Sequence, residues 1–445
     1  MATRVLVVGL AATGEAVARH FASTADVTVT DDRLDEAARA VRAADLGATT
    51  APAGATADAL VAAHDLVVPS PGVPPSHPLL MAAVRAGVPV RSEIDVAAAQ
   101  LHPPLVAITG TNGKTTVTML VAAMLERSGL ETVAAGNIGR PLLDLVGRDD
   151  GVDVVVAEVS SFQLEFTTTF RPQVAVLLSL APDHLDWHGS FADYAAAKGR
   201  IFAQQHPDDV LVANRDDREV AQLAAAAPST VQWYSITTGA ADGYRIERDT
   251  LVDDDGAEII GVEELGPRAP HDVANALAAA AAARAAGASL EGVAAVLRDP
   301  PRAAHRMTPV ATIDGVTYFD DSKATNPHAT ASAVRGFEHV VLIAGGRNKG
   351  LDLAPLRELA PRLEAVVAIG DSAGDVEAAF RDAVPVETAP TMRDAVRAAA
   401  RRARRGGVVL LSPACASFDW YPNYGARGDD FAREVRALTD RTEVS

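Results

Sequence analysis

Short, uninterrupted apolar runs recur along this chain, separated by stretches rich in alanine. The clearest runs lie at 154–157, 174–178, 340–343, 366–369 and 408–411. Because such a run has no polar face, it suits a strand that is buried on both sides of a parallel sheet. The alanine-rich stretches suit the helices that connect parallel strands. We therefore predict an α/β protein built on parallel sheets.

The length of the chain indicates several domains. At 445 residues it exceeds what one hydrophobic core normally supports. The proline pairs Pro103-Pro104 and Pro300-Pro301 would each end a helix and stiffen a connector. They leave three pieces of plausible domain size, and we predict an α/β domain in each.

Composition restricts the class of partner. A formal net charge of −18 argues against nucleic acid or an anionic membrane as a bulk partner. The single cysteine, Cys415, permits no intramolecular disulfide and fits a reducing compartment. The chain enters a strand at Arg4 without a signal peptide, and its alanine-rich run at 275–283 is too short to span a bilayer. We expect a cytoplasmic, soluble protein.

Lysine is rare in this chain. Of the 40 basic residues only Lys114, Lys198, Lys323 and Lys349 are lysines. Where arginine serves as the ordinary surface cation, a retained lysine is a candidate for chemistry that needs a compact ammonium or a reactive amine. Three of them stand among glycines or small residues, and Lys198 lies in a helix-like run. The alternative is that they are surface residues retained by coincidence.

The N-terminal segment begins like a nucleotide-binding βαβ unit. A strand at 5–8 runs into a turn at Gly9, and a second strand at 27–30 ends at Asp31. An acidic residue at this distance from the turn can reach a ribose or a base. Ala11 occupies the place of the middle glycine of the dinucleotide fingerprint, which weakens the case for a bound pyrophosphate. A purely structural α/β turn fits the same residues.

A phosphate-binding loop is the strongest local motif. It reads Gly-Thr-Asn-Gly-Lys-Thr-Thr at 110–116, after a strand and before an amphipathic helix. Backbone N–H groups and the helix N-terminus can surround phosphates there. Lys114 can bridge the β- and γ-phosphates, and the Thr115 hydroxyl can bind Mg²⁺. Ile108 stands where the usual motif has its first glycine, so the loop is a variant. A turn without a phosphate is the alternative.

Three further residues are candidates for metal or proton chemistry. Glu158 ends the apolar run at 154–157, His184 lies in a loop, and Lys198 lies in a helical run. A carboxylate at the end of a buried strand beside a P-loop can bind Mg²⁺. Each residue also has a structural alternative. Glu158 could form an ion pair, His184 could be a hydrogen-bonded loop histidine, and Lys198 could only neutralise phosphate.

Seven short motifs follow one another along the chain. The central motifs are GTNGKTT at 110–116, GNIG at 136–139, EVSSFQLE at 158–165, DHLDWH at 183–188 and AAKGRIF at 196–202. The C-terminal motifs are FDDSKATN at 319–326 and LSPACASFD at 411–419. The order of these motifs resembles that of the ATP-dependent Mur ligases of peptidoglycan synthesis. The resemblance covers the whole chain, and its C-terminal motifs are similar to those of the members that add D-glutamate. It implies a Rossmann-like domain at 1–93, a central P-loop ATPase-like domain with a parallel sheet at 94–302, and a Rossmann-like C-terminal domain at 303–445.

The resemblance implies an ATP- and Mg²⁺-dependent amide ligase with a carbamylated Lys198. Its small-molecule substrates would be UDP-N-acetylmuramoyl-L-alanine and D-glutamate, joined through an acyl phosphate. The implied catalytic residues are Lys114, Lys198, His184 and Lys323. The implied metal ligands are Thr115, Glu158, His184 and Lys198. The implied ATP contacts are Gly110, Thr111, Asn112, Gly113, Lys114, Thr115, Thr116, Asn275, Arg306 and Asp321.

The resemblance also assigns contacts to the other two substrates. Those to the UDP substrate would be Thr13, Asp31, Arg33, Gly72, Asn137 and Ser160. Those to the amino acid would be Thr325, Lys349, Ser417, Phe418 and Tyr424, with Lys323 beside them. We expect Asn275 in a helix that follows a loop at 271–272, and Ser417 at the start of a helix. We also expect a monomer that binds no nucleic acid and no membrane.

Two alternatives remain from the sequence. The first is another amide ligase of the same type, which would add L-alanine, a diamino acid, a dipeptide or polyglutamate. The motifs around Lys323 and Ser417 discriminate, because they lie apart from the shared ATP loop. The second is a P-loop regulatory ATPase without ligation. It would release ADP without dependence on an amino acid.

Overall fold

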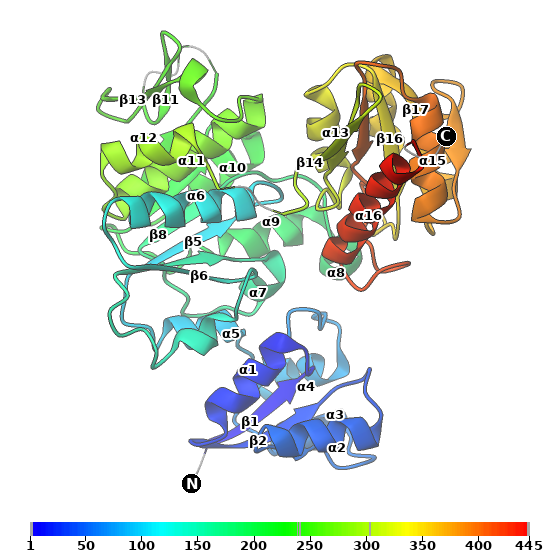
Figure 1. Ribbon diagram of the computed structural model, residues 1–445. Coiled ribbons are helices and arrows are strands. Elements are labelled where there is room, and N and C mark those ends of the chain that lie inside the picture. Colours follow the sequence, from blue (N-terminus) through cyan, green and yellow to red (C-terminus); the bar gives the residue numbers. More distant parts are fainter. Residues whose placement is uncertain (1–2, 238, 240–241, 302–303, 443–445) are drawn as a thin grey trace. The chain divides into compact units, whose positions relative to one another are not determined.

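The computed structural model describes residues 3–237, 239, 242–301 and 304–442 (Figure 1). The chain separates into two units, one of residues 1–180 and 187–301 and the other of 181–186 and 302–445. The predicted domain boundary between 302 and 303 falls on residues outside the described set. The boundary between 93 and 94 stays a prediction.

The first sheet of the first unit is parallel and has the strand order β3-β2-β1-β4. Its strands are β1 (Thr3–Val8), β2 (Ala25–Thr30), β3 (Thr49–Thr50) and β4 (Leu66–Pro69). Its helices are α1 (Ala12–Phe21), α2 (Glu36–Asp45), α3 (Ala57–Ala62) and α4 (Pro78–Ala86), followed by α5 (Glu93–Ala98). The apolar residues of β1 are buried on both faces, as a parallel strand requires.

The second sheet of this unit is also parallel, in the order β10-β9-β8-β5-β7-β6. Its strands are β5 (Leu105–Thr109), β6 (Thr132–Gly136), β7 (Val154–Glu158), β8 (Val174–Leu177), β9 (Val210–Asn214) and β10 (Thr230–Tyr234). Carboxyl ends of parallel strands meet at one edge of a sheet. The segments that follow β5, β7 and β8 are therefore neighbours, which places the phosphate loop next to Glu158.

Helices and a small antiparallel sheet complete the first unit. The helices are α6 (Lys114–Arg127), η1 (Leu142–Leu145), α7 (Ser161–Glu165), α8 (Leu185–His188), α9 (Phe191–Gly199), α10 (Arg218–Ala224), η2 (Val262–Glu264), α11 (Pro270–Ala285) and α12 (Leu290–Arg298), of which α8 begins in the second unit. The small sheet, which the sequence did not predict, pairs β11 (Arg245–Glu247), β12 (Thr250–Val252) and β13 (Glu258–Gly261).

Helix α11 explains the alanine-rich run. Residues 276–283 are all buried, and the helix packs against α6 (Figure 1). A helix that is apolar all round belongs in a protein interior, and alanine lets its neighbours approach closely. His271 and Asp272 lie in the first turn of α11, not in a loop as expected, because Pro270 starts the helix one residue earlier. No helix among the described residues is long and apolar enough to cross a membrane.

The sheet of the second unit has the order β14-β15-β19-β16-β17-β18. Its strands are β14 (Thr308–Ile313), β15 (Val316–Asp320), β16 (Val340–Gly345), β17 (Leu363–Ile369), β18 (Val386–Thr388) and β19 (Val408–Leu411). Its helices are α13 (Pro327–Arg335), η3 (Ala354–Arg362), α14 (Ala373–Phe380), α15 (Met392–Arg402) and α16 (Tyr424–Thr442). Two apolar clusters cover its two faces.

The predicted fold class is confirmed: the protein is α/β, with parallel sheets. All five apolar runs named above form strands. The sheet of the second unit differs in one respect, because β14 pairs antiparallel with β15 through a tight turn at Asp314-Gly315. Since β15, β19 and β16 are adjacent and parallel, the loops that follow them lie at one edge.

Candidate active site

The phosphate loop follows β5 and leads directly into α6. Gly113 precedes the helix with a φ of 85°, a conformation that favours glycine. A Cβ atom there would lie 2.6 Å from Asn275 Oδ1. The loop is held from the other side by Ser179, whose carbonyl and hydroxyl accept hydrogen bonds from the backbone N–H groups of Thr111 and Asn112. The predicted ATP contacts Gly113 and Asn275 therefore pack together.

Two lysines converge on this loop. Lys114 Nζ donates to the carbonyl oxygens of Gly110 at 2.9 Å and Thr111 at 3.0 Å. Lys198 Nζ donates to the same Gly110 oxygen at 2.9 Å and to Thr109 Oγ1 at 3.3 Å. Lys198 is only 1% exposed, so it is not a surface residue retained by coincidence.

A carboxylate and a hydroxyl meet beside the loop. Glu158, at the end of β7, is buried and accepts hydrogen bonds from Thr115 Oγ1 at 2.6 Å and from Asn137 Nδ2 at 2.8 Å. Among the described residues, no three His, Cys, Asp or Glu side chains gather as a metal site. Mg²⁺ typically binds through one or two carboxylates together with substrate phosphates. Thr115 and Glu158 beside a phosphate loop fit that requirement.

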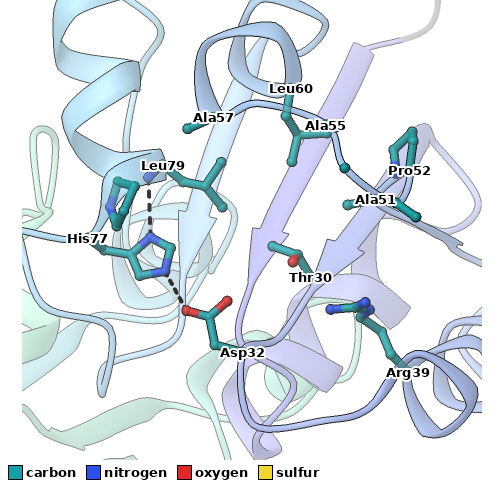
Figure 2. Close-up of a pocket in the computed structure, with 13 residues that line it drawn as sticks. Thr30, Asp32, Arg39, Ala51, Pro52, Ala55, Ala57, Leu60, His77 and Leu79 are labelled. Atoms are coloured by element: carbon teal, nitrogen blue, oxygen red, sulfur yellow. Dashed lines mark hydrogen bonds and ion pairs between the residues drawn. The ribbon is translucent and has the colours of Figure 1, made fainter.

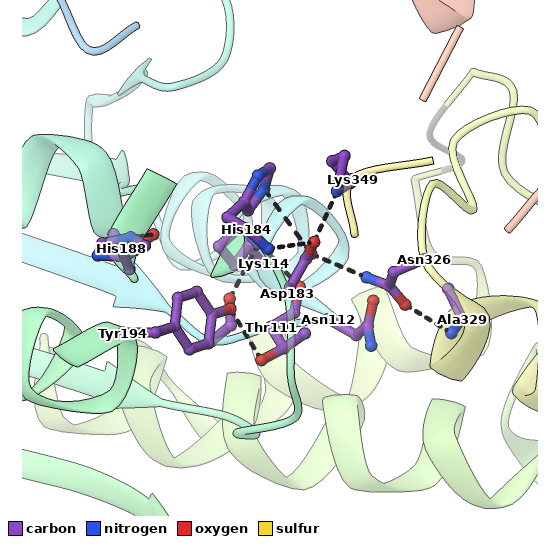
Figure 3. A network of polar contacts seen from close by, with 12 residues as sticks. Thr111, Asn112, Lys114, Asp183, His184, His188, Tyr194, Asn326, Ala329 and Lys349 are labelled. Carbon is purple, nitrogen blue, oxygen red and sulfur yellow. Dashed lines mark hydrogen bonds and ion pairs between the residues drawn. The ribbon is translucent and has the colours of Figure 1, made fainter. Parts of the chain in front are cut away.

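Tyr194 belongs to this site, although the sequence reasoning gave it no role. Its hydroxyl lies 2.9 Å from Thr111 Oγ1 (Figure 3). Lys198 Nζ lies 4.8 Å from the centre of its ring. A spacing of four residues places Tyr194 and Lys198 on the same face of α9, which was the available clue. Ser160, predicted for the UDP substrate, caps α7 and donates to Gln163 Oε1 at 2.8 Å.

The segment 181–186, whose last two residues begin α8, contains His184 and belongs to the second unit. Asp183 Oδ1 lies 2.6 Å from Lys349 Nζ, and Asp183 Oδ2 accepts a hydrogen bond from Asn326 at 3.1 Å (Figure 3). The His184 imidazole lies 3.7 Å from the same carboxylate. Neither Asp183 nor Asn326 was assigned a role from the sequence, although both lie in motifs quoted above. Since Thr115 and Glu158 belong to the first unit, their sharing of a metal with His184 stays a prediction.

Asp321 is buried at the end of β15. It accepts hydrogen bonds from Ser412 Oγ at 2.8 Å and from the Met307 backbone at 3.3 Å. Burial raises the pKa of Asp321 to about 7, against the opposing charge of Arg306. Arg306 itself is half-buried. The two residues predicted to contact ATP in this unit thus interact electrostatically.

The residues predicted for the amino acid lie near the carboxyl ends of β15, β16 and β19. Lys323 Nζ lies 5.3 Å from the centre of the Tyr424 ring. Ser417 is buried, whereas Phe418 is exposed and Thr325 half-buried. The expectation that Ser417 starts a helix is wrong. A short turn follows it, and α16 begins only at Tyr424, because Pro422 cannot continue a helix from that turn.

In the N-terminal sheet, Asp31 is engaged by the backbone. Its carboxylate accepts hydrogen bonds from the N–H groups of Leu10 at 2.6 Å and Arg33 at 2.8 Å. Ser70, in the turn that contains Gly72, donates to the carbonyl of Gly9 at 2.9 Å. These bonds hold the turn after β1 in place. Of the other predicted contacts, Thr13 is half-buried, whereas Arg33 and Gly72 are exposed.

A cleft of about 310 Å³ opens at the carboxyl edge of this sheet, near β2 and β3 (Figure 2). His77 Nε2 lies 3.0 Å from Asp32 Oδ2 at its wall, and Arg39 lines it from α2. The predicted UDP contacts Asp31 and Arg33 flank Asp32 in sequence but do not line this cleft. The predicted residues Thr13 and Gly72 do not line it either.

Comparison with known proteins covers nearly the whole chain. Residues 3–92 match the Mur ligase MurD-like N-terminal domain, residues 108–283 the Mur ligase middle domain, and residues 305–415 the glutamate ligase domain of Mur ligases. A UDP-N-acetylmuramoylalanine--D-glutamate ligase of Frankia casuarinae is 45% identical, over 97% of this chain and 94% of its own. The ligase of the same name from Thermobifida fusca is 42% identical, over 98% of each chain.

Solved structures share the fold at low identity. MurF from Acinetobacter baumannii superposes with a TM-score of 0.64 at 17% identity, covering 96% of this chain and 93% of its own. The UDP-N-acetylmuramate-alanine ligase MurC from Thermotoga maritima superposes with a TM-score of 0.60 at 19% identity, covering 98% of this chain and 99% of its own. At such identities the likeness concerns the fold alone.

Proposed function

The chain belongs to the Mur ligase family, and we propose that it joins D-glutamate to UDP-N-acetylmuramoyl-L-alanine at the expense of ATP. Identity to ligases of that activity over nearly the full chain is the observation that carries this function. The motifs around Lys323 and Ser417, which lie apart from the shared ATP loop, favour D-glutamate over the other amino acids. The three domains at 1–93, 94–302 and 303–445 are part of the proposal, as is action by a cytoplasmic monomer.

The reaction proceeds in two steps. The carboxylate of the nucleotide-linked L-alanine attacks the γ-phosphorus of ATP, which gives an acyl phosphate and ADP. The amine of D-glutamate then attacks the acyl carbon, and the tetrahedral intermediate expels phosphate to leave an amide. Lys114 and the N–H groups of its loop bind the phosphates and stabilise the charge that develops on the transferred group.

Thr115 and Glu158 are the residues of the first unit that would hold Mg²⁺. When bound, the ion neutralises phosphate charge, which lowers the repulsion between the γ-phosphate and the substrate carboxylate. The Thr115 hydroxyl donates to Glu158, and Asn137 donates to the other carboxylate oxygen. Asn137 thereby orients Glu158. We also propose that Asn137 contacts the muramoyl part of the UDP substrate.

Lys198 is proposed to carry a carbamate. Its neutral amine would attack CO₂, form the C–N bond and lose a proton, which leaves an anionic carbamate. The burial of its amine beside Thr109 and Gly110 supports a role at the phosphate loop and not at the surface. The alternative for Lys198 is that it only neutralises phosphate. Arginine cannot form a carbamate, which accounts for a retained lysine.

The test measures ADP release by the wild type with UDP-N-acetylmuramoyl-L-alanine and a panel of amino acids. We expect release that depends on D-glutamate. Release that depends on L-alanine or a diamino acid would instead assign the chain to another ligase activity. Release that is independent of any amino acid would make it a P-loop ATPase without ligation.

A further inference from the structure

Arg427 is the largest fully buried side chain among the described residues, at 1% exposure. It lies in the first turn of α16. Arginine is almost never fully buried unless it is paired with a carboxylate. Within the part of the chain that the structure describes, however, every oxygen that accepts a hydrogen bond from Arg427 is uncharged.

The guanidinium connects two loops by direct hydrogen bonds. Nε donates to Ser322 Oγ at 2.9 Å and Nη2 donates to the Ser322 carbonyl at 2.8 Å. Nη1 donates to the carbonyls of Cys415 at 3.1 Å and Ala416 at 3.2 Å. Ser322 follows β15 and Ala416 follows β19. The guanidinium is planar and its N–H donors point in fixed directions, so it can donate to both loops at once. A lysine ammonium cannot do this.

A third loop, after β16, packs on the same group. A Cβ atom at Gly346 would lie 3.0 Å from Arg427 Nη1 and 2.3 Å from the Ala416 carbonyl oxygen, so only glycine allows this approach. Arg347 and Ala416 exchange two backbone hydrogen bonds, of 2.9 and 3.1 Å. Ser322 Oγ also donates to the Tyr424 carbonyl at 2.8 Å, which ties the start of α16 to the loop after β15.

Each of these loops carries a residue that the proposed function assigns to the amino acid. Lys323 directly follows Ser322, Ser417 directly follows Ala416, and Lys349 lies two positions after Arg347. Tyr424 is in the same turn of α16 as Arg427. The guanidinium therefore contacts the backbone beside these side chains, not the side chains themselves.

Arg427 also places a positive charge next to the loops that follow β15, β16 and β19. Burial lowers the pKa of Arg427 to about 10, which leaves it protonated at neutral pH. The Asp419 and Asp320 carboxylates act on it through space without accepting its hydrogen bonds. A charge in surroundings of low polarity acts over a longer range than one in water.

We propose that Arg427 is a positioning residue that fixes three loops of the amino-acid site and supplies positive charge that favours a dianionic amino acid. The inference rests on the proposed function. Asp321, the neighbour of Ser322 that is predicted to contact ATP, has its own partners in Ser412 and the Met307 backbone. Loss of Arg427 should therefore raise the KM for the amino acid and leave the KM for ATP unchanged.

The test compares Arg427→Gln and Arg427→Lys with Arg433→Gln in the full-length enzyme. Arg433 is the matched control, since it lies on the same helix with a side chain that is 69% exposed. Arg427→Gln should raise the KM for D-glutamate by about 10- to 100-fold, because charged hydrogen bonds to two loops are lost. Arg427→Lys keeps the charge but loses the planar set of donors, and it should raise the KM for D-glutamate less. Arg433→Gln should leave it unchanged.

Two further measurements separate positioning from loss of the fold. Positional isotope exchange in ATP, without D-glutamate, should proceed in Arg427→Gln at nearly the wild-type rate, because acyl phosphate formation does not need the amino acid. If Arg427→Gln does not fold, Ser322→Ala takes its place, since it removes one hydrogen bond to the guanidinium, together with the bond to the Tyr424 carbonyl, and keeps the charge. Ser322→Ala should raise the KM for D-glutamate by a few-fold and leave the KM for ATP unchanged.

The possible failures are distinguishable. A wild type that shows no D-glutamate-dependent ADP release contradicts the proposed function itself. If the wild type is active but folded Arg427 variants keep their KM for D-glutamate, the positioning role is wrong. Equal losses in isotope exchange and in the KM values of all three substrates would also overturn it, because they indicate a general structural role.

Discussion

The amines of Lys114 and Lys198 share one acceptor, the carbonyl oxygen of Gly110. The two residues are 84 positions apart (198 − 114) and lie on different helices. The rarity of lysine identified both residues from composition, but it could not show that they meet. We propose a distinct use for each amine, phosphate binding for Lys114 and a carbamate for Lys198, and these uses can be tested separately.

We expect Lys198→Arg to fold normally and to lose turnover by at least about 100-fold. Guanidinium stays protonated and cannot form a carbamate, although it keeps the positive charge. The rate of D-glutamate-dependent ADP release measures the loss, and circular dichroism checks the fold. Arg200→Lys, an exchange at an exposed position of the same segment, serves as the control. Wild-type activity in Lys198→Arg would reduce Lys198 to a simple cation.

Lys349→Ala should raise the KM for D-glutamate by about 10- to 100-fold, with the KM for ATP little changed. A charge-assisted hydrogen bond contributes roughly 1.5–3 kcal/mol. Lys349 Nζ forms an ion pair with Asp183, so a substrate carboxylate must compete with or join that pair. Steady-state kinetics with each substrate varied gives the KM values. The control is Arg357→Ala, which removes an exposed cation of the same unit, and equal effects of the two variants would contradict a specific role.

At the scale of elements, the helix α5 begins with a buried acid. Glu93 is 1% exposed, and its Oε1 accepts a hydrogen bond from the Leu143 N–H of η1 at 2.6 Å. Its second carboxylate oxygen has no hydrogen-bond partner among the described residues. Burial raises the pKa of Glu93 from 4.5 to about 7, against the opposing hydrogen bonds from Leu143 and Leu142. The contact between α5 and η1 therefore depends on pH.

The sign of that dependence follows from proton binding. Between pH 4.5 and about 7 the folded state keeps the Glu93 proton and the unfolded state releases it, so folding loses stability as the pH rises. From pH 5 to pH 8 we expect this group to lower the free energy of unfolding by about 2–3 kcal/mol. Urea unfolding at both pH values should show a smaller decrease in Glu93→Gln than in the wild type. Glu126→Gln, at an exposed position, should behave like the wild type.

The elements differ in how well the sequence predicts them. Strands buried on both faces, such as β7 and β16, appear as continuous apolar runs because every position in them is buried and nearly all carry an apolar side chain. The phosphate loop is equally local, since its glycines and Lys114 are contiguous. The prediction of a helix at Ser417 is wrong because a short turn and a helix share their first residues, and Pro422 prevents this turn from continuing as a helix.

Considered as a whole molecule, the protein divides its predicted substrate contacts between separate domains. The phosphate loop lies in the central domain, and the turn after β1, held by Asp31 and Ser70, lies in the N-terminal one. The amino-acid residues lie in the second unit. A substitution in one of these places should therefore change one substrate more than the others.

Lys114→Ala should abolish acyl phosphate formation while UDP-N-acetylmuramoyl-L-alanine still binds. The phosphates depend on the loop at 110–115, whereas the uridine is proposed to bind the N-terminal domain. Isothermal titration calorimetry should give an affinity for the UDP substrate within about threefold of the wild type, a change below 1 kcal/mol. Isotope exchange in ATP should be lost. Loss of both functions in a folded variant would show that the domains do not bind their substrates independently.

Long-range pairings account for most of what the sequence could not predict. Tyr194 meets Thr111, Asp183 meets Lys349, and Arg427 meets Ser322, across 83, 166 and 105 positions. No periodicity or local spacing links such residues, because strand order and packing bring them together. The assigned substrate contacts came from the family resemblance, and they stay predictions where no contact in the structure bears on them.

The low exposure of the lysines has a practical consequence for handling the protein. None of the four lysine side chains, all of them in the described part of the chain, is exposed, whereas lysine is usually a surface residue. Amine-reactive labels, crosslinkers and coupling surfaces would therefore find their lysine targets only at positions assigned to phosphate, carbamate or amino acid. Acylation with and without nucleotide, followed by peptide mass spectrometry, would therefore show which of these sites is occupied. Immobilisation for binding studies is better carried out through groups other than lysine amines.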